Sequence, residues 1–239
     1  MSALAVLDAE RIKLFTTRSP LWSAVAVAVL SLGLAAAQAS TVYGPDPLEP
    51  DRAAMGVAVF GVPVLMVLSA LTVTNEYRTG MIRTTLVAVP NRTLVLVSKA
   101  TVAAVFSGVY AAIMVMASIV VARSDPQGWR LVGAVAVYAM VAAVLGVGVG
   151  ALLRASAGAV AVLLLWPLVA EPMLGNLPNI SSTVGPYLPF ANAFVFTDVQ
   201  WLYPVYAMPW GELGSLVYFA AVTAVVFVAA LVMINRRDA

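Results

Sequence analysis

The sequence of 239 residues has a mean hydropathy of +0.98, and only 10% of its residues are charged. A soluble domain carries about a quarter charged residues, so this composition excludes a water-soluble globule and predicts a membrane protein with several spans. Cysteine and histidine are absent, which excludes disulfides, thiol chemistry, histidine metal sites and histidine-based triads. The formal net charge of +2 is weak support for an acidic partner, and we expect no nucleic acid to bind.

The first nineteen residues are too polar to span a membrane and predict an amphipathic helix. Its apolar side would hold Leu4, Leu7, Leu14 and Phe15, and its polar side Glu10, Lys13 and Thr17. We expect this helix, at 1–19, to lie on the inner membrane surface. The pair Ser19-Pro20 is expected to break the chain before the first span.

Six apolar stretches are long enough to cross a bilayer, which takes about 20 residues of helix. They cover residues 21–37, 53–73, 100–122, 131–153, 155–174 and 213–234. Each is continuously apolar rather than alternating, which favours helices over a barrel. The predicted fold class is an all-α integral membrane protein with six spans, in one domain over 1–239.

Basic residues predict the orientation of these spans. If the N-terminus is inside, the outer segments carry only Arg52, Arg123 and Arg130. The inner segments carry the other ten, which are Arg11, Lys13, Arg18, Arg78, Arg83, Arg92, Lys99, Arg154, Arg236 and Arg237. Cytoplasmic loops are enriched in Lys and Arg, so both termini are expected in the cytoplasm.

The inner segment 74–92 gathers charge between two apolar runs. Gly80 is expected to loosen the helix that follows Glu76. Residues 81–88 can form a short helix, which Pro90 would stop. The sequence thus predicts a cytoplasmic hairpin, in which a Glu76–Arg83 pair could hold the turn. The alternative is an ordinary basic loop placed by the charge bias alone.

Two features of the later spans have structural and functional interpretations. Gly146 and Gly150 fit close helix packing, because small residues four apart let backbones approach. Glu171 lies near the outer end of the fifth span, between Pro167 and Pro172. An acid within a span indicates a functional site by default, but its carboxylate could instead reach interfacial water.

The outer segment 175–212 is rich in proline and aromatic residues. Its aromatic residues are Tyr187, Phe190, Phe194, Phe196, Trp201, Tyr203, Tyr206 and Trp210. This composition predicts short interfacial helices anchored by an aromatic belt.

One set of residues in the inner segment carries a resemblance to a known family. These residues are Glu76, Tyr77, Arg78, Gly80, Arg83, Leu86, Pro90 and Arg92. In this order and spacing they resemble the signature of the type-2 ABC transporter permeases (the ABC-2 family), although Met81 stands where threonine is usual. The basic N-terminal segment, the six spans and the long outer segment resemble the family in kind, so the likeness extends over essentially the whole chain.

The resemblance implies that segment 74–92 is a coupling helix that contacts a separate nucleotide-binding ATPase subunit. The chain has no G-x-x-x-x-G-K-[ST] loop to hold phosphates. ATP and Mg²⁺ would therefore bind to the partner, and this chain would hold no cofactor, no metal and no catalytic residue. A second permease subunit, identical or related, would complete the pathway in the bacterial cell membrane. The outer segment would form re-entrant helices that cap the exit.

The resemblance also places the second span beside the transport pathway. The candidates for its lining are Phe60, Leu65, Met66, Trp166 and Glu171. With mostly apolar candidates, we expect export of a hydrophobic or amphipathic substrate such as a drug, lipid or natural product. The alternatives are a self-sufficient secondary transporter, an ABC-2 subunit for sodium efflux, or a membrane enzyme. The first would need coupling residues within the spans, and the last a catalytic constellation.

Overall fold

The computed structural model describes residues 2–41, 47–125, 128–178, 181–199, 203–204, 206 and 208–236, and within these ranges the regular structure is entirely helical. Trp201 and Arg237 lie outside the described residues. The elements are α1 (Ala3–Thr16), α2 (Arg18–Ser40), α3 (Pro50–Gly56), η1 (Val57–Gly61), α4 (Val62–Thr79), α5 (Met81–Ala88), α6 (Arg92–Ala122), α7 (Trp129–Leu153), α8 (Ser156–Leu165), η2 (Trp166–Ala170), α9 (Glu171–Gly175), α10 (Ser181–Val184), η3 (Gly185–Tyr187), α11 (Pro189–Thr197) and α12 (Gly211–Arg236).

Six helical segments are long and apolar enough to cross a membrane. They are Arg18–Ser40, Pro50–Thr79, Arg92–Ala122, Trp129–Leu153, Ser156–Gly175 and Gly211–Arg236. Each overlaps one stretch predicted from hydropathy, so the all-α class and the number of candidate spans are confirmed. The segments extend into polar flanks, because a helix continues until its backbone is capped and not where its apolar residues end.

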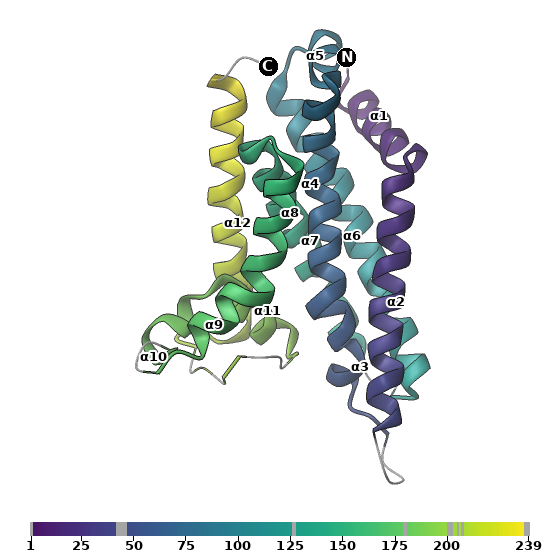
Figure 1. Cartoon of the computed structure of the whole chain (residues 1–239), viewed down its shortest axis with the longest axis vertical. Helices are drawn as coiled ribbons and strands as arrows, with labels where there is room; N and C mark the ends of the chain where they lie inside the picture. Colours follow the sequence, from purple (N-terminus) through teal and green to yellow (C-terminus); the bar gives the residue numbers. More distant parts are fainter. Residues whose placement is uncertain are drawn as a thin grey trace.

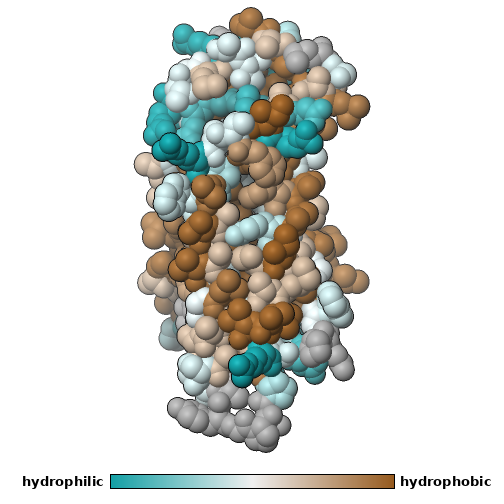
Figure 2. All heavy atoms as spheres, turned by 90° about the vertical axis from the view of Figure 1, so that its right-hand side faces the viewer, coloured by the Kyte–Doolittle hydropathy of each residue, from teal (hydrophilic) through white to brown (hydrophobic). Residues whose placement is uncertain are grey.

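The long helices pack around α7, which contacts α4, α6 and α12. Figure 1 shows that α1, α5 and the last turn of α12 lie at one end of the bundle, while α3 and α10 lie at the other. We call these the α5 end and the α3 end. The middle of the molecule is largely hydrophobic on the face that Figure 2 shows, and hydrophilic atoms gather in a band near the α5 end.

Helices α4 and α7 approach closely because α7 presents glycines to α4. A Cβ atom at Gly146 would lie 2.2 Å from the carbonyl oxygen of Met66, and one at Gly150 would lie 2.7 Å from that of Ala70. No side chain fits at either position, since real Cβ contacts are longer than this. The predicted small-residue packing is confirmed, with α4 as the partner helix.

Two spans contain a turn of π-helix beside a proline. η1 ends just before Pro63, and η2 contains Pro167. Proline lacks the N–H that would bond to the carbonyl four residues earlier, and wider turns are one way in which a helix accommodates this loss. In the fifth span, the helix continues through η2 into α9.

The N-terminal helix buries one residue from each of its predicted sides, Glu10 and Leu14, against the protein. Glu10 is only 6% exposed, whereas Leu4 and Phe15 are 74% and 66% exposed. Glu10 lies on the predicted polar side but meets the bundle and not water, whereas Thr17 on the same side is exposed. The break before the first span also differs, because it occurs at Thr17, whose backbone is extended, and Pro20 lies within α2.

The aromatic residues of the outer segment pack inward as well as outward. Phe190 and Phe194, both in α11, are 3% and 6% exposed. The Phe190 ring lies 5.4 Å from that of Phe219 in α12, and the Phe194 ring lies 6.1 Å from that of Tyr138 in α7. Helix α11 is therefore held against α7 and α12 by ring contacts, and these two rings belong to the core.

Candidate functional site: a buried charge cluster beneath an exposed helix

Gly80 ends one helix and begins another. Its φ of 72° lies in the left-handed region, and its N–H donates to the carbonyl of Tyr77 at 3.3 Å. This conformation favours glycine. Helix α5 then runs from Met81 to Ala88, and the chain is extended at Val89 before Pro90. The predicted helix at 81–88 is confirmed in its bounds.

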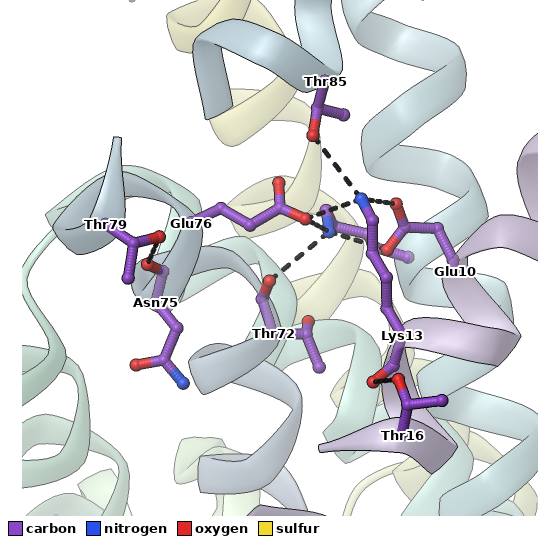
Figure 3. Close-up of polar contacts among 9 residues, drawn as sticks. Glu10, Lys13, Thr16, Thr72, Asn75, Glu76, Thr79 and Thr85 are labelled. Carbon is purple, nitrogen blue, oxygen red and sulfur yellow. Dashed lines mark hydrogen bonds and ion pairs between the residues drawn. The ribbon is translucent and has the colours of Figure 1, made fainter. Parts of the chain in front are cut away.

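A cluster of four charged side chains lies just beneath α5. Oε1 of Glu76 accepts hydrogen bonds from Nζ of Lys13 at 2.9 Å and from Nζ of Lys99 at 2.7 Å. Glu10 completes the cluster, with Oε1 bonded to Lys13 at 2.9 Å and Oε2 to Lys99 at 2.7 Å. Figure 3 shows Glu10, Lys13 and Glu76 converging from α1 and α4. We call these four residues the charge cluster.

Each ammonium group of the charge cluster has three acceptors. Lys13 also reaches the hydroxyl of Thr85 in α5 at 3.5 Å, and Lys99 reaches the carbonyl of Thr72 at 3.4 Å. Burial lowers the pKa of Lys13, but its hydrogen bonds to Glu10 and Glu76 outweigh this effect, and the net direction is upward. Each ammonium group is thus fully bonded, which offsets its burial, while Oε2 of Glu76 is buried without a hydrogen-bond partner in the described part of the chain.

The predicted Glu76–Arg83 pair does not form. Glu76 is 6% exposed and has both lysines as its ion-pair partners, while Arg83 is exposed. The left-handed turn at Gly80 ends α4, so the helical spacing assumed for the pair is interrupted. Sequence analysis missed Glu10, Lys13 and Lys99 as partners. The sequence held one indication of their role: Lys13 and Lys99 are the only two lysines in the chain.

Three more residues of the inner segment fix its position. The guanidinium carbon of Arg154 lies 4.8 Å from the ring centre of Tyr77, a cation–π geometry. Arg92 donates to the carbonyl of Ile234 at 2.9 Å and so ties the start of α6 to the end of α12. Leu86 packs onto a small apolar cluster formed by Val6, Val89 and Val95.

The other three residues of the set that carries the resemblance, Arg78, Arg83 and Pro90, are exposed. Val87 and Met81 of α5 are 82% and 52% exposed. Helix α5 therefore offers an apolar surface with an arginine, at the end of the molecule where the charge cluster lies.

A cavity of about 280 Å³ opens beside the charge cluster. Its walls come from α1, the start of α2, α4 and α6, and Met81 of α5 lies at its edge. The polar part of the lining includes all four residues of the charge cluster together with Arg78, and the apolar part includes Leu14, Pro20, Leu68, Leu71, Val102 and Ala103. The sequence did not predict this cavity, because its walls come together only in the folded bundle.

The pathway candidates are dispersed. Leu65 and Met66 have no exposed surface and pack in the core between helices. Phe60 is partly buried against the same core. Trp166 is 45% exposed and lies in η2. Met66 lies where α7 packs directly against α4, because Gly146 of α7 meets its backbone and side chain.

Glu171 does not reach water. Its side chain has no exposed surface. One oxygen accepts from the indole of Trp166 at 2.8 Å, and the other accepts from the backbone N–H groups of Phe190 at 2.9 Å and Ala191 at 3.3 Å. The interfacial-water interpretation is therefore wrong. Glu171 caps the first turn of α11, where free N–H groups and the helix dipole favour a carboxylate.

Tyr203 completes the surroundings of Glu171. Its hydroxyl lies 3.5 Å from the carboxylate and 3.3 Å from the carbonyl of Pro167. Burial and the neighbouring Glu171 carboxylate raise the pKa of Tyr203, so the hydroxyl keeps its proton and can donate. Both carboxylate oxygens of Glu171 are thus hydrogen-bonded within the protein, and neither is exposed.

Comparisons with known proteins add no identification: no family model matches the chain, and no curated protein matches it.

Proposed function

We propose that this chain is the membrane-spanning permease subunit of an ABC-2 type exporter, and that α5 docks a separate nucleotide-binding ATPase subunit. The proposal rests on one observation above all. Helix α5 exposes Met81, Arg83 and Val87 beyond the bundle while its other side is fixed to the bundle. An exposed apolar helix face with a charge suits a protein partner better than free solution.

The attachment of α5 explains how force would reach the spans. Ile82 is 4% exposed, and Thr85 is the α5 residue that meets Lys13 of the charge cluster. The charge cluster in turn joins α1, α4 and α6. A displacement of α5 by an ATPase would therefore act on two spans and on the N-terminal helix together, which is the requirement for coupling ATP hydrolysis to transport.

The remaining parts of the proposal are supported by the family resemblance and by the distribution of basic residues. The subunit sits in the bacterial cell membrane with both termini in the cytoplasm, and α1 lies at the inner surface with Leu4 and Phe15 toward lipid. A second permease subunit, identical or related, completes the pathway, and α11 caps its outer exit. The cargo is a hydrophobic or amphipathic molecule, and ATP and Mg²⁺ are held by the partner.

Copurification tests this function. The variant Arg83→Glu/Val87→Asp changes only exposed residues of α5, so the chain should still insert, and we expect at least a tenfold loss of copurified ATP-hydrolysing subunit from native membranes. The matched control is Arg11→Glu, an exposed arginine of α1 at the same end, which should retain the subunit. If both variants retain it, or if the wild-type chain transports cargo without any ATPase, segment 74–92 is only a basic loop.

A further inference from the structure

The lining of the cavity beside the charge cluster has an apolar part and a charged part. Leu68, Leu71, Val102 and Ala103 line its apolar side from α4 and α6. Both helices belong to candidate spans, so this side continues into the hydrophobic zone. A molecule that fits both parts is an amphiphile.

The charges of the lining are unequal in sign. Three cations, Lys13, Arg78 and Lys99, face two carboxylates, Glu10 and Glu76. Three of the four carboxylate oxygens accept from the two lysines at 2.7 to 2.9 Å, and the fourth, Oε2 of Glu76, is buried without a hydrogen-bond partner in the described part of the chain. Because each lysine also has three acceptors, neither has a donor to spare for a ligand.

Arg78 is the charged lining group that stays available. Its side chain is exposed, and it makes no ion pair or hydrogen bond within the part of the chain that the structure describes. It projects from the last turn of α4, with Asn75 and Thr79 of the same helix in the cavity lining. A guanidinium pairs with carboxylate or phosphate in a two-bond geometry.

We infer that this cavity binds an amphiphile with a single anionic head, a carboxylate or a phosphate, which pairs with Arg78 while the apolar body lies along Leu68, Leu71 and Val102. A cationic head would meet the repulsion of Arg78, and a neutral head would gain no ion pair. The inference deepens the proposed function, on which it rests for one point only, that the bound molecule is the cargo.

Photolabelling tests the site directly. The purified protein in phosphatidylcholine nanodiscs is irradiated with a diazirine analogue of palmitic acid, and competitors of equal chain length carry a carboxylate, an alcohol or a trimethylammonium group. We expect label on the peptides that contain residues 68–71 or 102–103, with the carboxylate as the strongest competitor. Arg78→Gln should weaken competition by the carboxylate about tenfold, the loss of one charge-assisted pair. Arg83→Gln removes the same charge at the same end and should leave it unchanged.

A second arm identifies the source of the anion. Nanodiscs that contain phosphatidylglycerol should suppress labelling if a membrane lipid fills the cavity, and should leave it unchanged if a single-chain cargo does; both results support an anionic amphiphile. The inference is overturned if the alcohol or the ammonium compound competes as well as the carboxylate, or if Arg78→Gln and Arg83→Gln behave alike. Photolabelling of the Arg83→Glu/Val87→Asp variant, expected to be normal, separates this outcome from a failure of the docking proposal, because that variant alters only α5 and keeps Arg78.

Discussion

Lys13 and Lys99 donate to the same carboxylate oxygen, Oε1 of Glu76, at 2.9 and 2.7 Å. One lysine comes from the N-terminal helix and the other from the third span, so a single atom joins α1, α4 and α6. Lys99 is 3% exposed, and its charge would be costly to bury without the carboxylates. The charge cluster therefore connects three helices close to α5, which contacts it through Thr85.

Replacing Glu76 should weaken the connection that the charge cluster makes between α1, α4 and α6. Glu76→Gln keeps the shape of the side chain but leaves two lysines with one carboxylate, and breaking a buried ion pair costs about 3–5 kcal/mol. We expect a clear fall in the thermal unfolding midpoint in detergent. Arg11→Gln is the control, because its pair with Asp8 is exposed on both sides and should contribute little. Equal unfolding midpoints for the two variants would show that the charge cluster does not stabilise the fold.

The turn between α4 and α5 is predicted to need glycine because of its backbone conformation and not because space is short. Gly80 has a φ of 72°, and a Cβ atom at this position would meet nothing within 4 Å, so Gly80→Ala should destabilise by about 1–2 kcal/mol through strain. Gly133 in α7 has equally open surroundings without a positive φ. Gly133→Ala should therefore be neutral or stabilising. Unfolding curves that move in the same direction for both variants would refute this explanation.

The capping role of Glu171 is predicted to be local. Glu171→Gln replaces a carboxylate that accepts from the N–H groups of Phe190 and Ala191 with a neutral amide. Since bonds to charged groups are stronger by about 1 kcal/mol or more, amide exchange at these two residues should speed up several-fold. Glu212→Gln, at an exposed glutamate, serves as the control. Unchanged exchange in Glu171→Gln would exclude the cap.

The orientation is predicted to place Ser2 in the cytoplasm and Arg52 outside. The chain has no cysteine of its own, so Ser2→Cys and Arg52→Cys each provide one thiol at an exposed position. A membrane-impermeant thiol reagent added to intact cells should label position 52 and not position 2. Labelling at position 2 and not at position 52 would show that the chain has the opposite orientation.

The sequence predicted the features that depend on residues close together in the chain. The six spans follow from hydropathy, and α5 follows from Gly80 and Pro90, which act within a few residues. Glu76, by contrast, pairs with a lysine 63 residues away, and Lys99 pairs with a glutamate 89 residues away. Such pairing depends on which helices meet, and no local pattern specifies it.

The same limit explains the other corrections. The polar side of α1 is visible in the sequence, but whether Glu10 meets water or Lys99 depends on the docking of that helix. Glu171 stands between two prolines in the sequence, yet two of the groups that bond its carboxylate come from α11, 19 and 20 residues later. The sequence showed that these residues were unusual, and the fold supplied their partners.

Crosslinking from α5 tests the central claim most directly. Val87→Cys introduces the only thiol of the chain at a position that is 82% exposed, and a thiol-reactive photocrosslinker attached there reports what contacts α5 in native membranes. We predict an adduct with a protein that carries a G-x-x-x-x-G-K-[ST] loop and hydrolyses ATP, and no such adduct from Arg52→Cys at the α3 end. No adduct from Val87→Cys, or an adduct only with lipid or with a second copy of this chain, would contradict the account.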